Sequence, residues 1–350
     1  MTVNSIETEI LEVKDLNSNY KNIKKGAEYL KKGEVVAIPT ETVYGLAADA
    51  FNESAIKKVF EVKGRPQDNP LLVHIYKLEQ VYDICKDIPK EAERVFDAFW
   101  PGSVTLIFKK KDCILDTVTA GMNTVAVRFP KSEVARAVIK ESGTLLVAPS
   151  ANLSGKPSTT SVKHCINDLS GKIPCILDGG SCSIGLESTI IDMSTPDPVL
   201  LRPGAISVDE ICDVIPNLIY KKDLLSVKES EIPKAPGMKY RHYAPDVPVT
   251  LVDGEYAKTS KWIEENANQD DAVICFEEFL NDFKNYKYTY SLGSFKTLNI
   301  AAQKIFDLLR ECDKLDVSHI YIQAPTNSGL GNSIINRLEK ASSGDIVILK

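Results

Sequence analysis

Two cations and one histidine lie close together in the segment KGRPQDNPLLVHI, residues 63–75. Lys63 and Arg65 stand in a stretch whose glycine and prolines disfavour helix, so we predict a turn there. A short apolar strand that carries His74 follows the turn. Cations fixed at the mouth of a strand are suited to an anion, whereas a functional and a structural role for His74 are equally supported.

Arg128 lies in VAVRF, a strand that is otherwise apolar. A buried guanidinium is costly without an anionic partner, and the local sequence offers no acidic neighbour. We therefore expect a carboxylate or phosphate ligand to be the partner of Arg128.

The other predicted loops are rich in hydroxyl groups and glycines. They include PTETVYG, APSANLSGKPSTT, GLESTI and LLRPG, and single cations such as Lys156, Arg202 and Lys239 lie in or beside such loops. The stretch SANLSG is suited to donate hydrogen bonds to a phosphate, although a simple hydroxyl-rich turn with a helix cap explains it equally well.

The sequence offers poor candidates for covalent or metal catalysis. No serine lies in a GxSxG motif, no CxxC pair occurs, and the four histidines lack metal-ligand spacing. Gly180 and Gly185 have P-loop spacing, but Leu186 and Glu187 replace its Lys and Ser/Thr. A site of cations and hydroxyls without a nucleophile or a protein metal cage is suited to phosphoryl or adenylyl transfer.

Short runs of β-branched residues, typical of strands, alternate with segments of helical periodicity. These predicted strands and helices must hold the candidate site residues in place. We predict helices at 20–33 and 52–64, the second capped by Asn52 and ended by Gly64, and buried strands at 34–39, 71–75, 103–108, 125–129, 144–149, 175–180 and 188–193. This pattern predicts an α/β domain over residues 1–220. A proline-rich linker over 221–247 and a small, mainly parallel α/β domain over 248–350 follow.

Composition limits the functional classes. The net charge of −6 provides no bulk attraction to nucleic acid. The sequence shows neither an export signal nor a run of about 18 apolar residues, so we expect a cytoplasmic protein without membrane contact.

Seven motifs, in this order, resemble the YrdC-like L-threonylcarbamoyladenylate synthase family: PTETVYGLA, KGRPQDNPLLVHI, WPGSVTLI, VAVRFP, APSANLSG, ESTIID and LRPGAI. The segment PGMKYRHYAP and the α/β domain after it resemble the longer, two-domain form of this family. The resemblance implies a twisted mixed sheet with a large concave cavity, plus a smaller Rossmann-like C-terminal domain.

The resemblance also implies that L-threonine, bicarbonate and ATP give threonylcarbamoyl-AMP and pyrophosphate, the first step of tRNA threonylcarbamoyladenosine modification. It assigns threonine binding to Thr42, His74, Arg128, Ala148 and Ser188. It assigns ATP binding to Arg65, Asn69, Thr124, Ser150, Ser158, Arg202 and Tyr243, with Lys63 and Arg65 as the catalytic cations near the phosphates.

Further expectations concern the lid and the partners. We expect residues 236–245, with Arg241, His242 and Tyr243, to form a lid. Mg²⁺ would accompany ATP without a protein cage of its own. The downstream tRNA threonylcarbamoyl transferase machinery would use the product, and contact with tRNA or double-stranded RNA is a further expectation.

Two alternatives remain at this stage. One is a double-stranded RNA- or tRNA-binding module without catalysis, which the negative charge and the separated cations disfavour. The other is a carbamoyl-transfer domain that acts on a protein, which the lack of zinc-finger-like or acylphosphatase-like segments disfavours.

Overall fold

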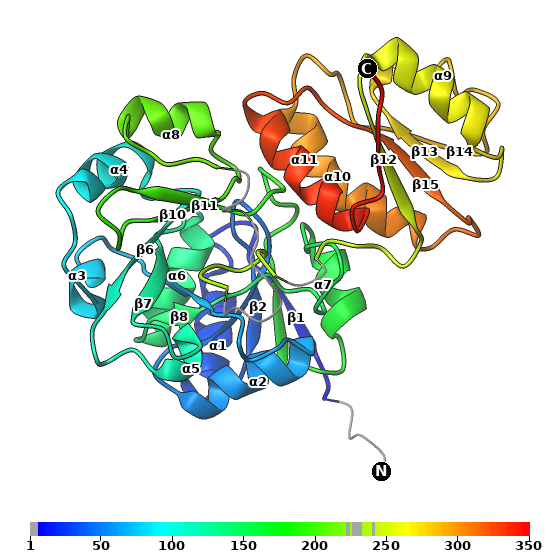
Figure 1. The fold of residues 1–350 in the computed structure, drawn as a ribbon. Helices are drawn as coiled ribbons and strands as arrows, with labels where there is room; N and C mark the ends of the chain where they lie inside the picture. The colour runs from blue at the N-terminus through cyan, green and yellow to red at the C-terminus, as the bar shows by residue number, and fades with distance from the viewer. Residues whose placement is uncertain (1–5, 222–224, 226–232, 240–241) are drawn as a thin grey trace. The chain divides into compact units, whose positions relative to one another are not determined.

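The structure is a computed structural model of the chain, and it describes residues 6–221, 225, 233–239 and 242–350. The described residues form two compact units, and each has its own sheet (Figure 1). The first unit contains residues up to 154, 159–183 and 187–239, and the second contains 155–158, 184–186 and the rest of the chain. The boundaries predicted at residues 220 and 248 stay predictions. Among the described residues, no helix has the length and apolar character that crossing a bilayer requires.

The first unit alternates strands and helices along most of its length. Its strands are β1 (Glu9–Glu12), β2 (Val36–Ile38), β3 (Gly45–Asp49), β4 (Leu72–His74), β5 (Cys85–Lys86), β6 (Val104–Lys110), β7 (Thr124–Arg128), β8 (Leu146–Val147), β9 (Cys175–Asp178), β10 (Thr189–Asp192) and β11 (Val199–Arg202). Its helices are α1 (Tyr20–Lys31), α2 (Glu53–Lys63), α3 (Gln80–Ile84), α4 (Glu91–Phe99), α5 (Asp116–Thr119), α6 (Glu133–Ser142), α7 (Val162–Leu169) and α8 (Val208–Val214).

These strands form one mixed sheet in the order β1-β9-β2-β3-β8-β4-β7-β6-β10-β11, with β5 paired to β6. Parallel pairs such as β4–β7 and β6–β10 alternate with antiparallel pairs such as β6–β7 and β10–β11. The predicted mixed α/β fold is therefore confirmed.

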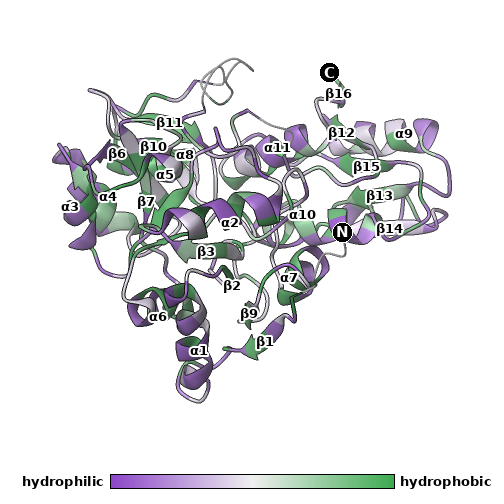
Figure 2. Cartoon of the chain, turned by 90° about the horizontal axis from the view of Figure 1, so that it is seen from below, coloured by the Kyte–Doolittle hydropathy of each residue, from purple (hydrophilic) through white to green (hydrophobic). Residues whose placement is uncertain are grey.

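Successive side chains of Val35 and β2 show that this sheet is covered on both faces. Val35 and Ala37 join one hydrophobic cluster, whereas Val36 and Ile38 join another, because neighbouring strand residues point to opposite faces. Helices α1 and α6 cover the second cluster, and α2, α4, α7 and α8 contribute to the first. The hydrophobic colouring of the strands in Figure 2 follows this burial.

The boundaries of α2 follow from its sequence as predicted. The Asn52 side chain accepts a hydrogen bond from the Ala55 N–H, which satisfies one of the free donors at the helix start. Gly64 ends the helix with φ 60°, a left-handed conformation that favours glycine. These two signals fix where the cationic turn begins.

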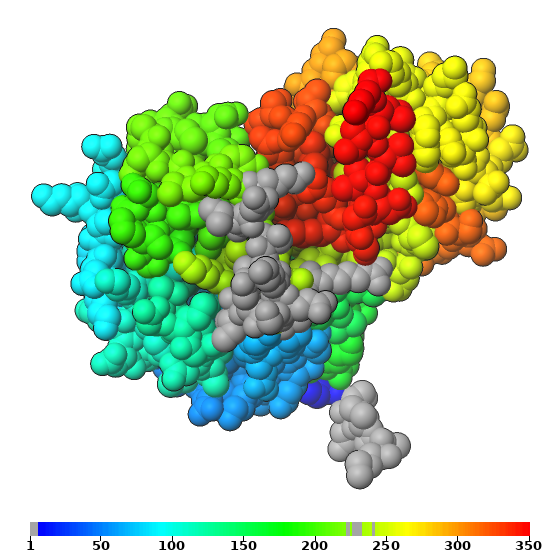
Figure 3. All heavy atoms as spheres, in the orientation of Figure 1, coloured from blue at the N-terminus to red at the C-terminus, as the bar shows by residue number. Residues whose placement is uncertain are grey.

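The second unit is the small parallel domain that the sequence predicts. Its strands β12 (Val249–Asp253), β13 (Ala272–Cys275), β14 (Tyr288–Ser291), β15 (Ile320–Gln323) and β16 (Ile346–Ile348) pair in the order β14-β13-β15-β12-β16. All four pairings are parallel. Its helices are α9 (Tyr256–Asn266), α10 (Asn299–Cys312) and α11 (Leu330–Ala341), with a short 3₁₀ turn, η2 (Glu277–Phe279). The edge strand β16, red in Figure 3, lies at the surface.

We predict that Gly204→Ala destabilises the first unit, because an added Cβ would lie 2.5 Å from backbone atoms of Glu187, Ser188 and Thr189. Overpacking of this kind costs about 1–3 kcal/mol. The measurement is urea unfolding followed by the fluorescence of Trp100, in a background where Trp262 is phenylalanine.

Gly26→Ala is the matched control, because its Cβ would meet side-chain carbons of Leu177 at 3.0 Å and alanine is favoured within a helix. We expect the free energy of unfolding of this control to change by less than about 1 kcal/mol. Equal stability of the two variants would contradict the prediction for Gly204.

Candidate functional site

Parallel strands β4 and β7 bring His74 and Arg128 side by side. The two residues are register partners at the ends of their strands, and both are buried. Because paired residues of neighbouring strands point to the same face, the imidazole and the guanidinium share one face of the sheet. The pairing thus joins two residues that stand far apart in the sequence.

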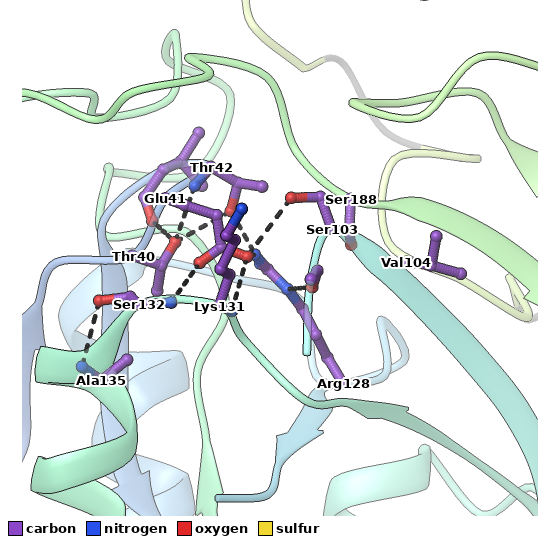
Figure 4. Close-up of polar contacts among 12 residues, drawn as sticks. Thr40, Glu41, Thr42, Ser103, Val104, Arg128, Lys131, Ser132, Ala135 and Ser188 are labelled. Atoms are coloured by element: carbon purple, nitrogen blue, oxygen red, sulfur yellow. Dashed lines mark hydrogen bonds and ion pairs between the residues drawn. The ribbon is translucent and has the colours of Figure 1, made fainter. Parts of the chain in front are cut away.

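The Arg128 guanidinium is held by three partners (Figure 4). Its Nε donates to the Gly102 carbonyl at 3.3 Å, its Nη1 to the Thr42 hydroxyl at 2.7 Å, and its Nη2 to Glu41 Oε1 at 2.6 Å. The local sequence of Arg128 holds no acidic neighbour, as predicted, but the fold supplies Glu41 as an anionic partner in addition to the ligand that we expect. Glu41 was missed because it lies 87 residues away in sequence, so only the fold makes it a neighbour.

Glu41 accepts further hydrogen bonds through both carboxylate oxygens. Oε1 accepts from the Lys131 N–H at 3.1 Å and from the Ser103 hydroxyl at 3.3 Å, and Oε2 accepts from the Ser132 N–H at 3.1 Å. Ser132 is also the N-cap of α6. Glu41 thus connects Arg128 to the start of a helix.

A second network surrounds Ser188. Its hydroxyl lies 2.7 Å from the Thr105 hydroxyl, and its carbonyl accepts from Arg202 Nη2 at 2.9 Å and Nε at 3.2 Å. The Ser103 carbonyl accepts from the Thr189 N–H at 3.0 Å. Because Ser103 also contacts Glu41, it links the Ser188 network to the Arg128 network.

Two predictions overlapped at Lys63: the helix over 52–64 is confirmed, and the turn is wrong at this position, because Lys63 is the last residue of α2. Gly64 is the residue that leaves the helix, and the turn begins there. The Lys63 ammonium is buried and donates to the carbonyls of Ser150 and Asn152. The structure therefore brings the Lys63 ammonium to the hydroxyl-rich loop that follows β8.

Arg65 folds back on the cationic turn. Its Nε donates to the Asn69 carbonyl at 3.3 Å and its Nη2 to the Pro70 carbonyl at 3.0 Å. Asn69 is buried, and its Oδ1 has no hydrogen-bond partner among the residues that the structure describes. The turn is thus closed by its own arginine, and the Asn69 Oδ1 stays without a partner among the described residues.

The remaining candidates of the first unit lie at strand ends. Ala148 follows β8, and its N–H donates to the Leu72 carbonyl at 3.1 Å. Thr124 begins β7, whereas Arg128 ends it, so about 13 Å separates them along the strand. Thr124 therefore lies at the opposite end of β7 from the Arg128 network.

Four predicted site residues, His242 among them, lie in the second unit or outside the described residues. Ser158 and Tyr243 belong to the second unit, and Arg241 lies outside the residues that the structure describes. The Tyr243 ring stacks on Phe306 with centroids 5.3 Å apart, and the Arg337 guanidinium lies 5.4 Å from it. Tyr243 also has φ 62°, a strained value for a residue with a side chain.

Electrostatics fix the protonation states of Glu41 and His74. Burial by itself raises the pKa of Glu41, but Arg128 and the backbone N–H donors lower it to about 2. Burial, and then the charge of Arg128, lower the pKa of His74 to about 3. At neutral pH the site therefore contains a carboxylate, a guanidinium and a neutral imidazole whose Nδ1 lacks a hydrogen-bond partner among the described residues.

This arrangement can bind an anion and orient it, because fixed N–H and O–H donors lie in a buried environment. The described residues contain no group of three or more His, Cys, Asp or Glu side chains placed to hold a metal ion. Glu41 and Ser103 extend the predicted site, and Glu41 could have been suspected from its place within PTETVYG.

Comparisons with known proteins cover almost the whole chain. The Sua5/YciO/YrdC family model, described as "Telomere recombination", matches residues 28–204. A second model, described as "Threonylcarbamoyl-AMP synthase, C-terminal domain", matches residues 206–343.

Individual relatives are similar over their full length. The threonylcarbamoyl-AMP synthase of Pyrococcus abyssi is 42% identical, with 97% of this chain and 99% of the relative covered. The protein of the same name from Bacillus subtilis is also 42% identical, with 95% and 96% covered. A crystal structure of P. abyssi Sua5 complexed with L-threonine has a TM-score of 0.85 at 38% identity, with 98% of this chain and 99% of that chain covered.

We predict that His74 makes the first unit less stable as the pH falls. In the unfolded chain His74 has the ordinary histidine pKa of 6.5, whereas in the folded chain its pKa is about 3. The free energy of unfolding therefore decreases as the pH falls from 6.5 toward 3, because the unfolded state binds the proton first. The slope from this one group approaches about 1.4 kcal/mol per pH unit.

The measurement is urea unfolding, reported by Trp100, at several pH values between 7.5 and 5. His74→Gln should flatten the dependence on pH, and His319→Gln in the second unit is the control that should leave it unchanged. Equal slopes in the native chain and His74→Gln would rule out a neutral, buried imidazole.

Proposed function

The chain belongs to the threonylcarbamoyl-AMP synthase family, and we propose that it converts L-threonine, bicarbonate and ATP into threonylcarbamoyl-AMP and pyrophosphate. The observation that carries this proposal is the buried Arg128, whose guanidinium is oriented by Thr42 and Glu41 beside a neutral His74. A planar, fixed guanidinium matches the geometry of an amino-acid carboxylate.

The proposed threonine site lies within the first unit. Arg128 receives the carboxylate, and the hydroxyls of Thr42 and Ser188 lie in the two hydrogen-bond networks that Ser103 joins. His74 and Ala148 complete the set. Strands β4 and β8 pair antiparallel, with His74 opposite Leu146, and the Ala148 N–H bonds to the Leu72 carbonyl of β4. A neutral His74 suits an amine that must lose its proton before it reacts with bicarbonate.

The proposed ATP residues of the first unit are Lys63, Arg65, Asn69, Thr124, Ser150 and Arg202. A carbamate oxygen of N-carboxythreonine attacks the α-phosphorus, and pyrophosphate leaves with the electrons of the broken P–O bond. Lys63 and Arg65 offset the charge that develops on the leaving pyrophosphate. The chemistry requires no nucleophile from the protein.

Mg²⁺ is proposed to accompany ATP, held by phosphate oxygens and water rather than by a carboxylate cage of this chain. Its role when bound is to neutralise phosphate charge. The tRNA threonylcarbamoyl transferase machinery is the proposed user of the product, and the cytoplasm is the proposed location. A purely RNA-binding function is not favoured, because the full-length relatives carry the name of a synthase.

The second unit contributes Ser158, His242 and Tyr243 to the proposal. Backbone strain such as that at Tyr243 persists where the surroundings enforce it, and such strain is concentrated at functional sites. The role of residues 236–245 as a lid stays a prediction.

We predict that pyrophosphate release from ATP requires both L-threonine and bicarbonate, because the attacking oxygen exists only after the amine has become a carbamate. The measurement is a coupled pyrophosphate assay with each substrate omitted in turn, in buffer freed of carbon dioxide. ATP turnover at the same rate without threonine would refute the proposed function.

We also predict that His242→Ala weakens ATP binding about tenfold, the ratio that corresponds to about 1.4 kcal/mol. This variant removes the contact of the His242 ring with Tyr243 but leaves the stacking of Tyr243 on Phe306 in place. Calorimetric titration with ATP is the measurement, and His319→Ala is the matched control from the same unit. An ATP affinity within twofold of the native value would show that His242 is not part of the site.

A further inference from the structure

We propose that Glu41 is a positioning residue for L-threonine binding, and that it acts through Arg128. The inference rests on the proposed function, which assigns the threonine carboxylate to Arg128. Glu41 itself is not assigned to the substrate, and its role follows from four hydrogen bonds that no other carboxylate of the described site makes.

The contacts of Glu41 join elements that the backbone does not connect. Its side chain is only 7% exposed, and its oxygens reach Arg128 at the end of β7, Ser103 before β6, and the backbone at the start of α6. A carboxylate that accepts from fixed backbone N–H groups is itself fixed. Glu41 therefore holds the Arg128 guanidinium, which stands at the end of a long side chain with several rotatable bonds (Figure 4).

The hydrogen-bond inventory of Arg128 shows what this fixation achieves. A guanidinium has five N–H donors, one on Nε and two on each terminal nitrogen. Contacts within the described residues use one donor on each nitrogen, toward Gly102, Thr42 and Glu41. Each terminal nitrogen thus keeps a second N–H, and this pair of donors suits a carboxylate that binds in a bidentate manner.

The charges explain why a carboxylate beside Arg128 does not abolish anion binding. The lowered pKa of Glu41 keeps it ionised at neutral pH, and its charge is shared with the N–H groups of Lys131 and Ser132 and with the Ser103 hydroxyl. Without Glu41, the buried guanidinium would lack a charged partner and would be free to turn toward other acceptors. Glu41 thus weakens the net attraction of the site for a substrate carboxylate but holds the Arg128 guanidinium in the orientation that binds it.

The test measures steady-state kinetics of Glu41→Gln and Glu41→Asp. The amide of Gln cannot accept from all four donors, so we expect the KM for threonine to rise at least tenfold while the KM for ATP stays within twofold. Asp keeps the charge but is shorter, so its loss should be smaller than that of Gln. Threonine binding measured by calorimetry gives a readout that does not depend on turnover.

Glu133→Gln is the matched control, because Glu133 lies in the first turn of α6, the helix whose start Glu41 contacts. It removes one carboxylate near the same helix end, and we expect the KM for threonine to be unchanged. A comparable rise in KM for Glu133→Gln would show a general effect of charge at α6 and would overturn the inference.

Arg128→Lys tests whether Glu41 acts through the arginine. In that background Glu41→Gln should change the KM for threonine by less than threefold, because the fork that Glu41 orients is absent. Full, additive losses would overturn the inference, as would equal losses for threonine and ATP in Glu41→Gln and Glu41→Asp. If the native chain releases pyrophosphate without threonine, the proposed function is refuted. If the native chain requires threonine but the Glu41 variants have native kinetics, only the proposed role of Glu41 is refuted.

Discussion

The burial of one guanidinium is the constraint on which the site depends. Arg128 ends a strand in the middle of the sheet, where water is excluded, and a charge in that position requires hydrogen-bond partners and a counter-charge. Thr42, Gly102 and Glu41 supply them from two separate loops. The loop after β2 and the loop before β6 must therefore meet at the end of β7, and this meeting point is the core of the proposed threonine site.

The same burial controls the protonation of the neighbouring groups. A cation next to His74 disfavours a second positive charge, while it favours the negative charge of Glu41. The site thus keeps a neutral imidazole and an ionised carboxylate over the whole physiological range. Such a fixed pattern of charge suits a reaction in which positioning, rather than a protein nucleophile, supplies the catalysis.

The sequence allowed much of the fold to be predicted, because the relevant signals are local. Strands such as β4, β7, β9 and β10 were recognised from β-branched apolar runs, and α2 from its cap and its terminal glycine. Strands β1, β3, β5 and β11 were not predicted, and the predicted loop LLRPG is wrong in part because its first three residues, up to Arg202, belong to β11. β5 has two residues and exists only as a partner of β6, and β3 follows a loop whose small residues give no periodic pattern.

By itself, the sequence determined the residue types that meet in the site, the order of the motifs and the family that they resemble. The tertiary structure alone decided that Glu41 pairs with Arg128, and that Lys63 reaches the carbonyls of the loop after β8. The physical reason is that local patterns specify helices and strands, whereas the partner of a buried charge is specified by which distant loops the sheet brings together. Electrostatic pairing acts through space over a few ångströms. The fold, rather than distance along the chain, therefore decides which residues come close enough to pair.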